Sequence, residues 1–107
     1  MDNQKDKNGF DLSIITISYD INSDLIRCLK SCRFLKISVE HILVFPQKEK
    51  QQALLQFGNK YKFYFDQSKG IYNAINLGLK NSKGKKILIL HGDNFLTYNG
   101  SELIEKN

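Results

Sequence analysis

Acidic residues follow three of the four apolar runs that we predict to be strands. Asp20 follows the first run, Asp66 the third and Asp93 the fourth, where the sequence reads His91-Gly92-Asp93-Asn94. The carboxyl ends of parallel strands meet at one edge of a sheet, and ligands bind there in α/β proteins. Carboxylates next to lysines and helix N-termini could bind a phosphate-bearing ligand and a divalent cation. The alternative is that Asp, Asn and Gly are only turn-forming residues at strand ends.

Several well-known sites are missing from the sequence. There is no G-x-G-x-x-G after the first strand, no Walker A motif and no nucleophile elbow. His41 falls inside a predicted strand, so we interpret it as a packed residue. Cys28 and Cys32 share one face of a predicted helix, and no second Cys/His pair stands at zinc spacing. We interpret the two cysteines as small buried helix residues.

The stretch 69–94 carries the clearest structural pattern. Apolar or small residues recur with a helical period, which predicts a helix; they are Ile71, Ala74, Ile75, Gly78 and Leu79. We expect Gly84 to cap the C-terminus of this helix in a left-handed conformation. The continuous apolar run 87–90 is typical of a strand that is covered on both faces.

The rest of the chain alternates strands and helices. We expect strands at 12–19, 38–45 and 61–65, and helices at 24–34 and 48–57. Before the first of these helices, Asp20, Asn22 and Ser23 are typical turn and N-cap residues, and Asp24 adds an acid to its first turn. We expect this helix to bury Leu25, Cys28, Leu29 and Cys32, and the second to face inward with Leu54, Leu55 and Phe57. Connections of helical length between strands require parallel pairing. The predicted class is therefore α/β, a Rossmann-like, open and mainly parallel sheet with helices on both faces.

Composition limits the function classes. The chain has 107 residues, of which 41% are hydrophobic and 25% charged, as in an ordinary globular domain. No apolar run approaches the roughly 20 residues of a membrane span, and the polar N-terminus is unlike a signal peptide, so we expect a cytoplasmic location. The net charge of +5 favours anionic partners or is simply a solvated lysine-rich surface. We expect no nucleic-acid partner, because the lysines form no single stripe.

Three segments together resemble a known family. They are SIITISYD at 13–20, KGIYNAINLGLK at 69–80 and ILILHGDN at 87–94. Residues 12–96 are thus similar to the donor-binding half of a family 2 glycosyltransferase with the GT-A fold, and KGIYNAINLGL is the most specific segment. We divide the chain into a frayed N-terminus (1–11), this nucleotide-sugar-binding half (12–96) and a C-terminal tail (97–107).

The resemblance implies a nucleotide-diphosphate sugar as donor, used in polysaccharide biosynthesis. It implies a saccharide or lipid-linked acceptor hydroxyl and leaves room for peripheral membrane association. The box 91–93 matches the family's acidic D-x-D box, which makes Asp93 the ligand of Mn²⁺ or Mg²⁺ and brings His91 and Gly92 to the donor. By the same matching, the other donor-site residues are Tyr19 and Asp20 at the nucleobase, Asp66, Lys69 and Gly70 near base and ribose, and Asn76 on the helix flank.

The sequence also departs from the family. The carboxylate expected after the second strand is replaced by Pro46-Gln47-Lys48, and His91 stands where the box usually begins with Asp. Such enzymes are roughly twice as long, and no general base for the acceptor hydroxyl follows Asn94. We therefore expect a truncated or incomplete domain with little transferase activity alone. The alternative is a non-catalytic binding or interaction module descended from a glycosyltransferase.

Overall fold

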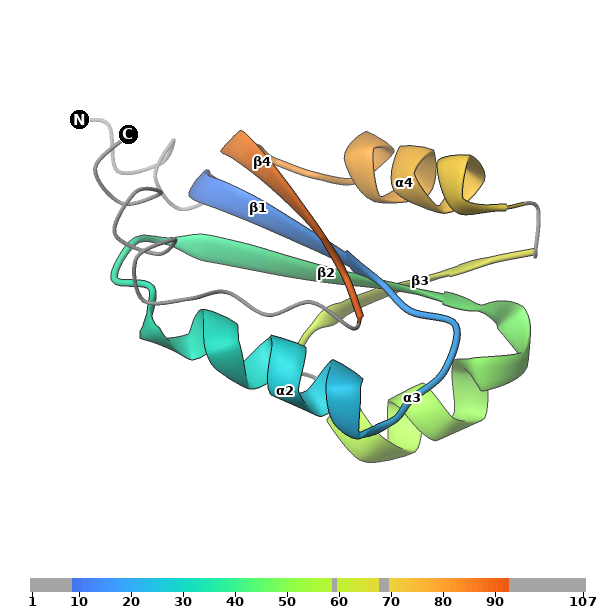
Figure 1. The fold of residues 1–107 in the computed structure, drawn as a ribbon. Coiled ribbons are helices and arrows are strands. Elements are labelled where there is room, and N and C mark those ends of the chain that lie inside the picture. The colour runs from blue at the N-terminus through green and yellow to red at the C-terminus, as the bar shows by residue number, and fades with distance from the viewer. Residues whose placement is uncertain (1–8, 59, 68–69, 93–107) are drawn as a thin grey trace.

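The computed structural model describes residues 9–58, 60–67 and 70–92, and Figure 1 shows how they are arranged. Within these residues four strands alternate with three α-helices. The strands are β1 (Phe10–Ile17), β2 (Val39–Pro46), β3 (Lys62–Asp66) and β4 (Gly84–His91). The helices are α2 (Ser23–Ser31), α3 (Lys50–Phe57) and α4 (Ile71–Lys80), with 3₁₀ turns η1 (Cys32–Phe34) and η2 (Gln47–Glu49).

The strands form one parallel sheet in the order β3-β2-β1-β4. The chain therefore leaves β1 in one direction to build β2 and β3, and returns on the other side to add β4. This is the strand order of half a Rossmann sheet, and it creates a switch point between β1 and β4. The predicted α/β class, with a parallel Rossmann-like sheet, is confirmed.

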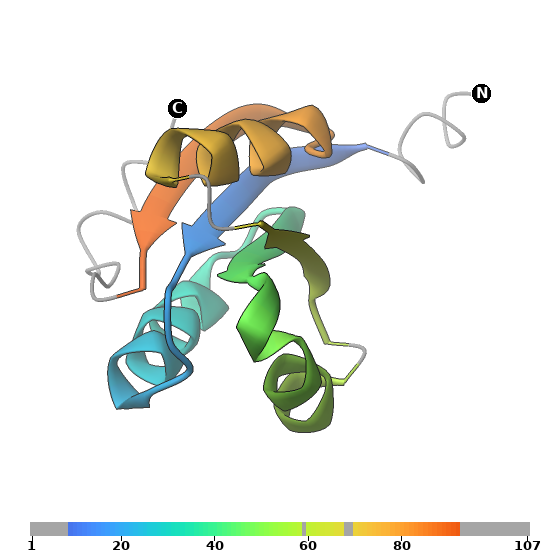
Figure 2. The same cartoon turned by 90° about the vertical axis from the view of Figure 1, so that its right-hand side faces the viewer.

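Helices cover both faces of the sheet, as predicted. Figure 2 shows α4 above the sheet and α2 with α3 below it. On the lower face, Leu25 and Phe57 pack against Leu43 and Phe45. On the upper face, Ala74 of α4 packs against a cluster of buried aliphatic residues, namely Ile15, Ile17, Ile42 and Val44. None of the helices in the described ranges is long and apolar enough to cross a membrane.

The buried face of α3 differs from the prediction. Leu54 and Leu55 are 48% and 85% exposed, so the expectation that they face inward is wrong. The helix buries Phe57, as predicted, together with Ala53, which lies four residues away on the same face. Phe57 stacks with Phe45 at 6.4 Å between ring centroids, and burial of this large ring sets the rotation of the helix.

Gly84 does not cap α4, contrary to the prediction. The helix ends at Lys80, and the side chain of Asn81 donates to the carbonyl of Leu77 at 2.8 Å. Gly84 instead begins β4, where its N–H donates to Ser13 Oγ at 2.7 Å. A Cβ on Gly84 would lie 2.4 Å from the backbone nitrogen of Ser13, so the close pairing of β4 with β1 requires glycine here.

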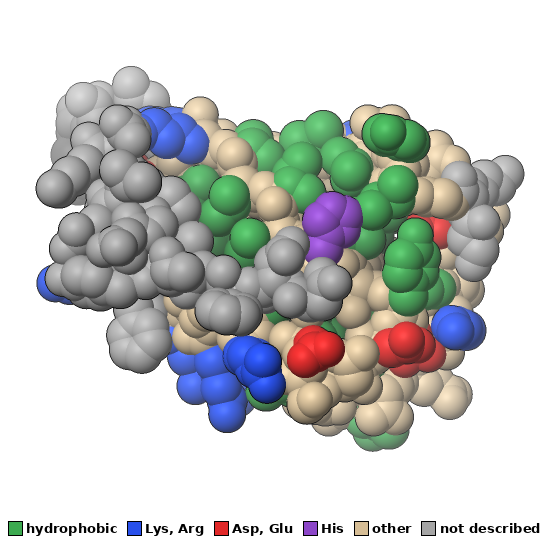
Figure 3. All heavy atoms as spheres, viewed as in Figure 1, with side chains coloured by type: hydrophobic (Ala, Val, Ile, Leu, Met, Phe, Trp, Pro, Cys, Tyr) green, Lys and Arg blue, Asp and Glu red, His purple; other side chains and the backbone are tan. Residues whose placement is uncertain are grey.

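One face of β4 is less covered than its apolar sequence predicts. Ile87 and Ile89 are 41% and 37% exposed, so the expected burial on both faces is wrong for this strand. Helix α4 packs against β1, β2 and β3, and β4 pairs only with β1 among the described strands. Figure 3 shows hydrophobic side chains over β4 and α4. Tyr72 and Leu79 of α4 are also exposed.

A buried carboxylate joins the amino ends of the strands. Glu40 of β2 is 3% exposed and accepts hydrogen bonds from Ser13 Oγ (2.7 Å), the Lys83 N–H (2.8 Å) and Lys62 Nζ (2.5 Å). Burial raises the pKa of Glu40, but these hydrogen bonds together hold it below its ordinary value. The network contacts β1, β2, β3 and the start of β4, so it fixes their relative register.

A second polar pair, which is partly buried, links β1 and β2. His41 Nε2 lies 2.8 Å from Thr16 Oγ1, and the imidazole ring packs edge-on against Tyr61. Burial lowers the pKa of His41 to about 4, so the ring is neutral at pH 7. His41 is thus a packed residue, and the side chains of Cys28 and Cys32 are buried, as the sequence predicts.

Candidate functional site

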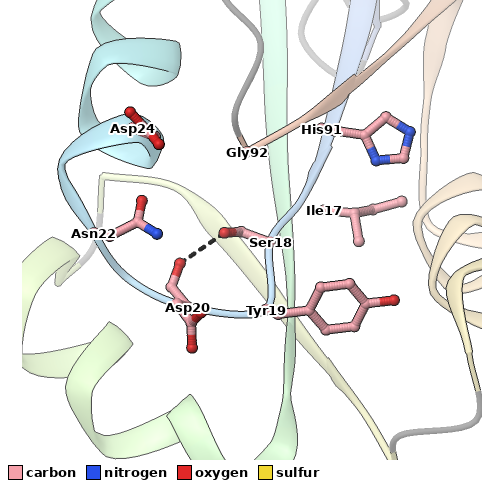
Figure 4. Close-up of a pocket in the computed structure, with 8 residues that line it drawn as sticks. All are labelled: Ile17, Ser18, Tyr19, Asp20, Asn22, Asp24, His91 and Gly92. Carbon is pink, nitrogen blue, oxygen red and sulfur yellow. Dashed lines mark hydrogen bonds between the residues drawn. The ribbon is translucent and has the colours of Figure 1, made fainter.

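A pocket of about 460 Å³ opens at the carboxyl ends of β1 and β4. Its lining comes from the end of β1, the following loop, the first turn of α2 and the end of β4, as Figure 4 shows. The lining residues are Ile17, Ser18, Tyr19, Asp20, Asn22, Asp24, His91 and Gly92. The pocket therefore lies at the switch point of the sheet, where open α/β folds bind their ligands.

Backbone hydrogen bonds hold the two strand ends together under the pocket. The N–H of Gly92 donates to the carbonyl of Ile17 at 2.9 Å, which joins the ends of β4 and β1. The N–H of Ser18 donates to the carbonyl of Val44 at 3.1 Å, which joins the end of β1 to β2. A Cβ on Gly92 would lie 2.6 Å from Ser18 Oγ and 2.8 Å from Ser18 Cβ. Only glycine lets β4 end this close to Ser18.

The loop after β1 is shaped by its own side chains. Ser18 Oγ donates to the carbonyl of Asp20 at 2.6 Å, which turns the chain away from the sheet. Asn22 then caps α2 by accepting from the Leu25 N–H at 3.0 Å. Asp24 lies in the first turn, where a carboxylate stabilises the helix dipole. The predicted role of this segment as turn and N-cap is confirmed.

The pocket has two chemically different sides. In Figure 4 the side chains of Ile17, Tyr19 and His91 project to one side, and those of Asn22 and Asp24 lie on the other. Tyr19 is 56% exposed and offers an aromatic ring that a planar ligand could stack on. The opposite side offers carboxylate and amide oxygens, which accept hydrogen bonds from hydroxyl groups.

The charges of the lining limit what binds. Asp20 and Asp24 are acidic, and none of the described residues that line the pocket is Lys or Arg. A phosphate group alone would be repelled by these carboxylates, whereas a hydroxyl-rich group or a cation-bound phosphate would fit. In the described ranges no three His, Cys, Asp or Glu side chains gather closely enough to hold a metal ion. A metal here would need further ligands, such as Asp93 and the phosphate oxygens of the ligand.

The structure brings together four of the nine residues that the sequence analysis assigns to the donor and metal site. They are Tyr19, Asp20, His91 and Gly92. Asp66, Gly70 and Asn76 do not line this pocket: Asp66 ends β3, which β2 separates from β1, and Asn76 is exposed on α4. Lys69 and Asp93 lie outside the described residues.

Gly70 has a structural reason of its own. It is the N-cap of α4 with φ of 102°, a conformation that side chains rarely adopt. Its place in the KGIYNAINLGL segment therefore follows from the backbone turn into the helix, whether or not it contacts a ligand.

Four residues of the pocket were not assigned to the site from sequence. They are Ile17, Ser18, Asn22 and Asp24, although the sequence explains the last two as helix cap and first-turn acid. Those structural roles are correct, and they place the same side chains at the ligand side of the sheet. Their position directly after β1 was the sequence feature that could have assigned them to the pocket. That assignment also requires β1 to lie next to β4, which the sequence does not show.

Comparisons with known proteins support the fold. The crystal structure of S. aureus TarS residues 1–349, a glycosyltransferase, matches with a TM-score of 0.70 and 19% sequence identity. The match covers 89% of this chain and 30% of that one. No protein-family model matches the chain, and no curated protein matches it by sequence. The similarity shows a glycosyltransferase-like fold, and at this identity it shows the fold alone.

Proposed function

We propose that the chain is a glycosyltransferase-like domain that binds a nucleotide-diphosphate sugar in the pocket between β1 and β4. The observation that carries this proposal is the pocket itself, at the switch point of a sheet similar to that of a glycosyltransferase. Membership of family 2 is part of the proposal, and the KGIYNAINLGL segment supports it.

Each side of the pocket suits one part of such a ligand. The exposed ring of Tyr19 would stack on the nucleobase, and the oxygens of Asp20 and Asn22 would accept from the ribose hydroxyls. Both groups are held in place before binding, because Ser18 fixes the loop and Asn22 caps α2. Such preorganisation reduces the ordering cost of binding.

The diphosphate requires a positive charge that the described lining does not contain. We propose that Mn²⁺ or Mg²⁺, held by Asp93 and by the phosphate oxygens, supplies it. When bound, the ion would neutralise the diphosphate and stabilise it as a leaving group. His91 lies at the same strand end, and its ring N–H would donate to a phosphate or sugar oxygen.

Transfer of the sugar needs more than this pocket. A general base must deprotonate the acceptor hydroxyl of a saccharide or lipid-linked acceptor, and we assign no residue of this chain to that role. The chain spans 30% of the length of the TarS structure. We therefore propose donor binding, in the cytoplasm, as the function of residues 1–107, and little sugar transfer by these residues alone.

Calorimetric titration with UDP, GDP and dTDP, each with and without Mn²⁺, tests donor binding. We expect one nucleotide to bind in a metal-dependent manner, and Tyr19→Ala and Asp93→Ala each to weaken it about tenfold or more. Tyr72→Ala is the matched control, because Tyr72 is 79% exposed on α4 and outside the pocket. Equal loss in the control, or no binding to any nucleotide by the folded chain, would reject the proposal.

A second candidate is a non-catalytic interaction module with the same fold. The strand ends favour it in one respect: β2 runs directly into the turn Gln47–Glu49 without the expected carboxylate, and His91 replaces an acid. If this candidate is right, Asp93→Ala combined with Lys69→Ala leaves the biological role intact. The titration above separates the two candidates, since the module need not bind a nucleotide.

A further inference from the structure

A second cleft, of about 160 Å³, lies at the end of the molecule opposite to the pocket. Helix α2 begins beside the pocket with Asn22 and ends at this cleft with Leu29 and Lys30. The end of α3 and the two residues just before β3, Lys60 and Tyr61, form the other wall. The cleft is lined by Ile26, Leu29, Lys30, Arg33, Gln56, Phe57, Lys60 and Tyr61.

The charged residues that line the cleft are all positive. Lys30, Arg33 and Lys60 converge on it, and no Asp or Glu is among the lining residues. In the part of the chain that the structure describes, the carboxylate found in an ion pair is Glu40, with Lys62, and none of the three cleft cations has such a partner. Three like charges around one cleft repel each other, and a bound anion would remove this repulsion.

The floor and one wall of the cleft are rigid. Phe57 is buried in the core, and Tyr61 packs edge-on against it at 5.8 Å between ring centroids. The guanidinium group of Arg33 lies close to the Tyr61 side chain, at the mouth of the cleft. Burial raises the pKa of Tyr61, so its hydroxyl keeps its proton at pH 7. The apolar floor lowers the local dielectric and strengthens attraction to an anion.

The dipole of α2 explains only part of this arrangement. Cations near a helix C-terminus offset its partial negative charge, which accounts for Lys30 and for Arg33. It does not account for Lys60, which comes from a different segment and converges on the same cleft. The combination of an arginine fork, two ammonium groups and a tyrosine hydroxyl matches the oxygens of a phosphate group.

We propose that the cleft between the C-terminal ends of α2 and α3 binds a phosphate group of a phosphorylated ligand. This site is separate from the proposed donor pocket and does not depend on it. The phosphate could belong to a free phosphorylated compound or to a lipid headgroup, and both present the same oxygens to Arg33, Lys30 and Lys60.

Amide NMR of the full chain tests this inference, with inorganic phosphate as the probe at constant ionic strength and chloride as reference. We expect saturable shifts at the amides of Arg33, Lys60 and Tyr61. The double variant Arg33→Gln with Lys60→Gln should bind phosphate at least about tenfold more weakly, because it removes two charge-assisted contacts. The single variant Lys60→Gln, an exposed position, should give an intermediate loss.

The control is Lys85→Gln with Lys86→Gln, which removes two exposed charges from β4 outside the cleft. The affinity of this variant for phosphate should lie within twofold of that of the unmodified chain. Phosphate shifts no larger than those of chloride, or an equal loss in the control, would overturn the proposal. Sedimentation with phosphatidylglycerol vesicles and with phosphatidylcholine vesicles separates the sources: cleft-dependent binding to the former indicates a lipid headgroup, and phosphate binding without vesicle binding indicates a free compound.

Discussion

Replacing Glu40 by Gln should lower the free energy of unfolding at neutral pH. This loss of stability should become smaller as the pH falls. Gln keeps one carbonyl oxygen, which can still accept from the Ser13 hydroxyl and the Lys83 N–H. It loses the negatively charged oxygen, Oε2, that accepts a hydrogen bond from Lys62 Nζ at 2.5 Å. The variant therefore removes one charged interaction and weakens two others without changing the shape of the side chain.

The expected magnitude follows from these contacts. Hydrogen bonds to charged groups contribute about 1.5–3 kcal/mol, against about 0.5–1.5 kcal/mol for neutral ones. The Lys62 side chain is 42% exposed, so solvent screens part of its attraction to Glu40, and a neutral amide costs less to bury. We expect Glu40→Gln to lower the free energy of unfolding by about 1–2 kcal/mol at pH 7. Glu40→Leu should cost about 3–4 kcal/mol, because Ser13 and the Lys83 N–H lose their acceptor.

The pH dependence gives the decisive readout. The pKa of Glu40 in the folded chain is held below its ordinary value of 4.5, so the unfolded chain binds the proton first. The carboxylate therefore stabilises the fold fully above about pH 4.5, and this stabilisation is lost as the pH falls through the folded-state pKa. The difference between the original chain and Glu40→Gln should narrow below pH 4.5.

Urea unfolding followed by circular dichroism measures this difference, since the chain has no Trp for fluorescence. The comparison at each pH cancels the titration of other groups that both proteins share. A difference of less than about 0.5 kcal/mol at pH 7 would refute the magnitude, which rests on the net value of a buried charged hydrogen bond. A gap that stays constant from pH 7 to pH 3.5 would refute the assignment of a lowered pKa. Lys62→Gln, alone and combined with Glu40→Gln, isolates the contribution of the ion pair.

Three further predictions concern other buried contacts. His41 has a folded-state pKa of about 4, below its ordinary 6.5, so stability should fall by up to about 3 kcal/mol as the pH drops from 6.5 to 4, and His41→Gln should remove this slope in urea unfolding. Gly92→Ala should weaken nucleotide binding about tenfold in calorimetry while the chain stays folded by circular dichroism, because the new Cβ would displace Ser18 by the pocket; unchanged affinity would show that this strand end does not shape the site. Gly78→Ala should cost about 1–3 kcal/mol in urea unfolding, because its Cβ would lie 2.5 Å from Ile15 Cγ2, and a neutral result would mean that α4 moves away from the sheet freely.

The alternation of apolar runs and helical periods was enough to predict the parallel α/β fold. Helical spacing placed Leu25 and Cys28 correctly on the buried face of α2. It failed for Leu54 and Leu55 of α3 but not for Phe57. This short helix has few apolar residues and offered two possible faces, and the stacking of Phe57 on Phe45 decided between them. Local periodicity contains no information about such contacts between distant segments.

The candidate site shows the same limit. Residues at strand ends could be assigned to one edge of the sheet from sequence, but their grouping depends on strand order. The order β3-β2-β1-β4 puts Tyr19 beside His91 and separates Asp66 from both. The same strand order places Asn22 and Asp24 at the wall of the pocket, although the sequence explains them only as helix-start residues. Strand order is a property of the whole packed sheet, and no single segment specifies it.

The central place of β1 also affects how the chain folds. β1 precedes the other described strands in the chain, but Ser13 meets its hydrogen-bond partner Gly84 of β4 only 71 residues later. At about 5–20 residues per second, one edge of β1 stays unpaired for roughly 4–15 s after the strand leaves the ribosome. Contacts between such distant residues slow folding, because the long intervening loop must close first. β1, which pairs with β2 and with β4 in the finished sheet, therefore keeps one edge open to aggregation until the last described strand has been synthesised.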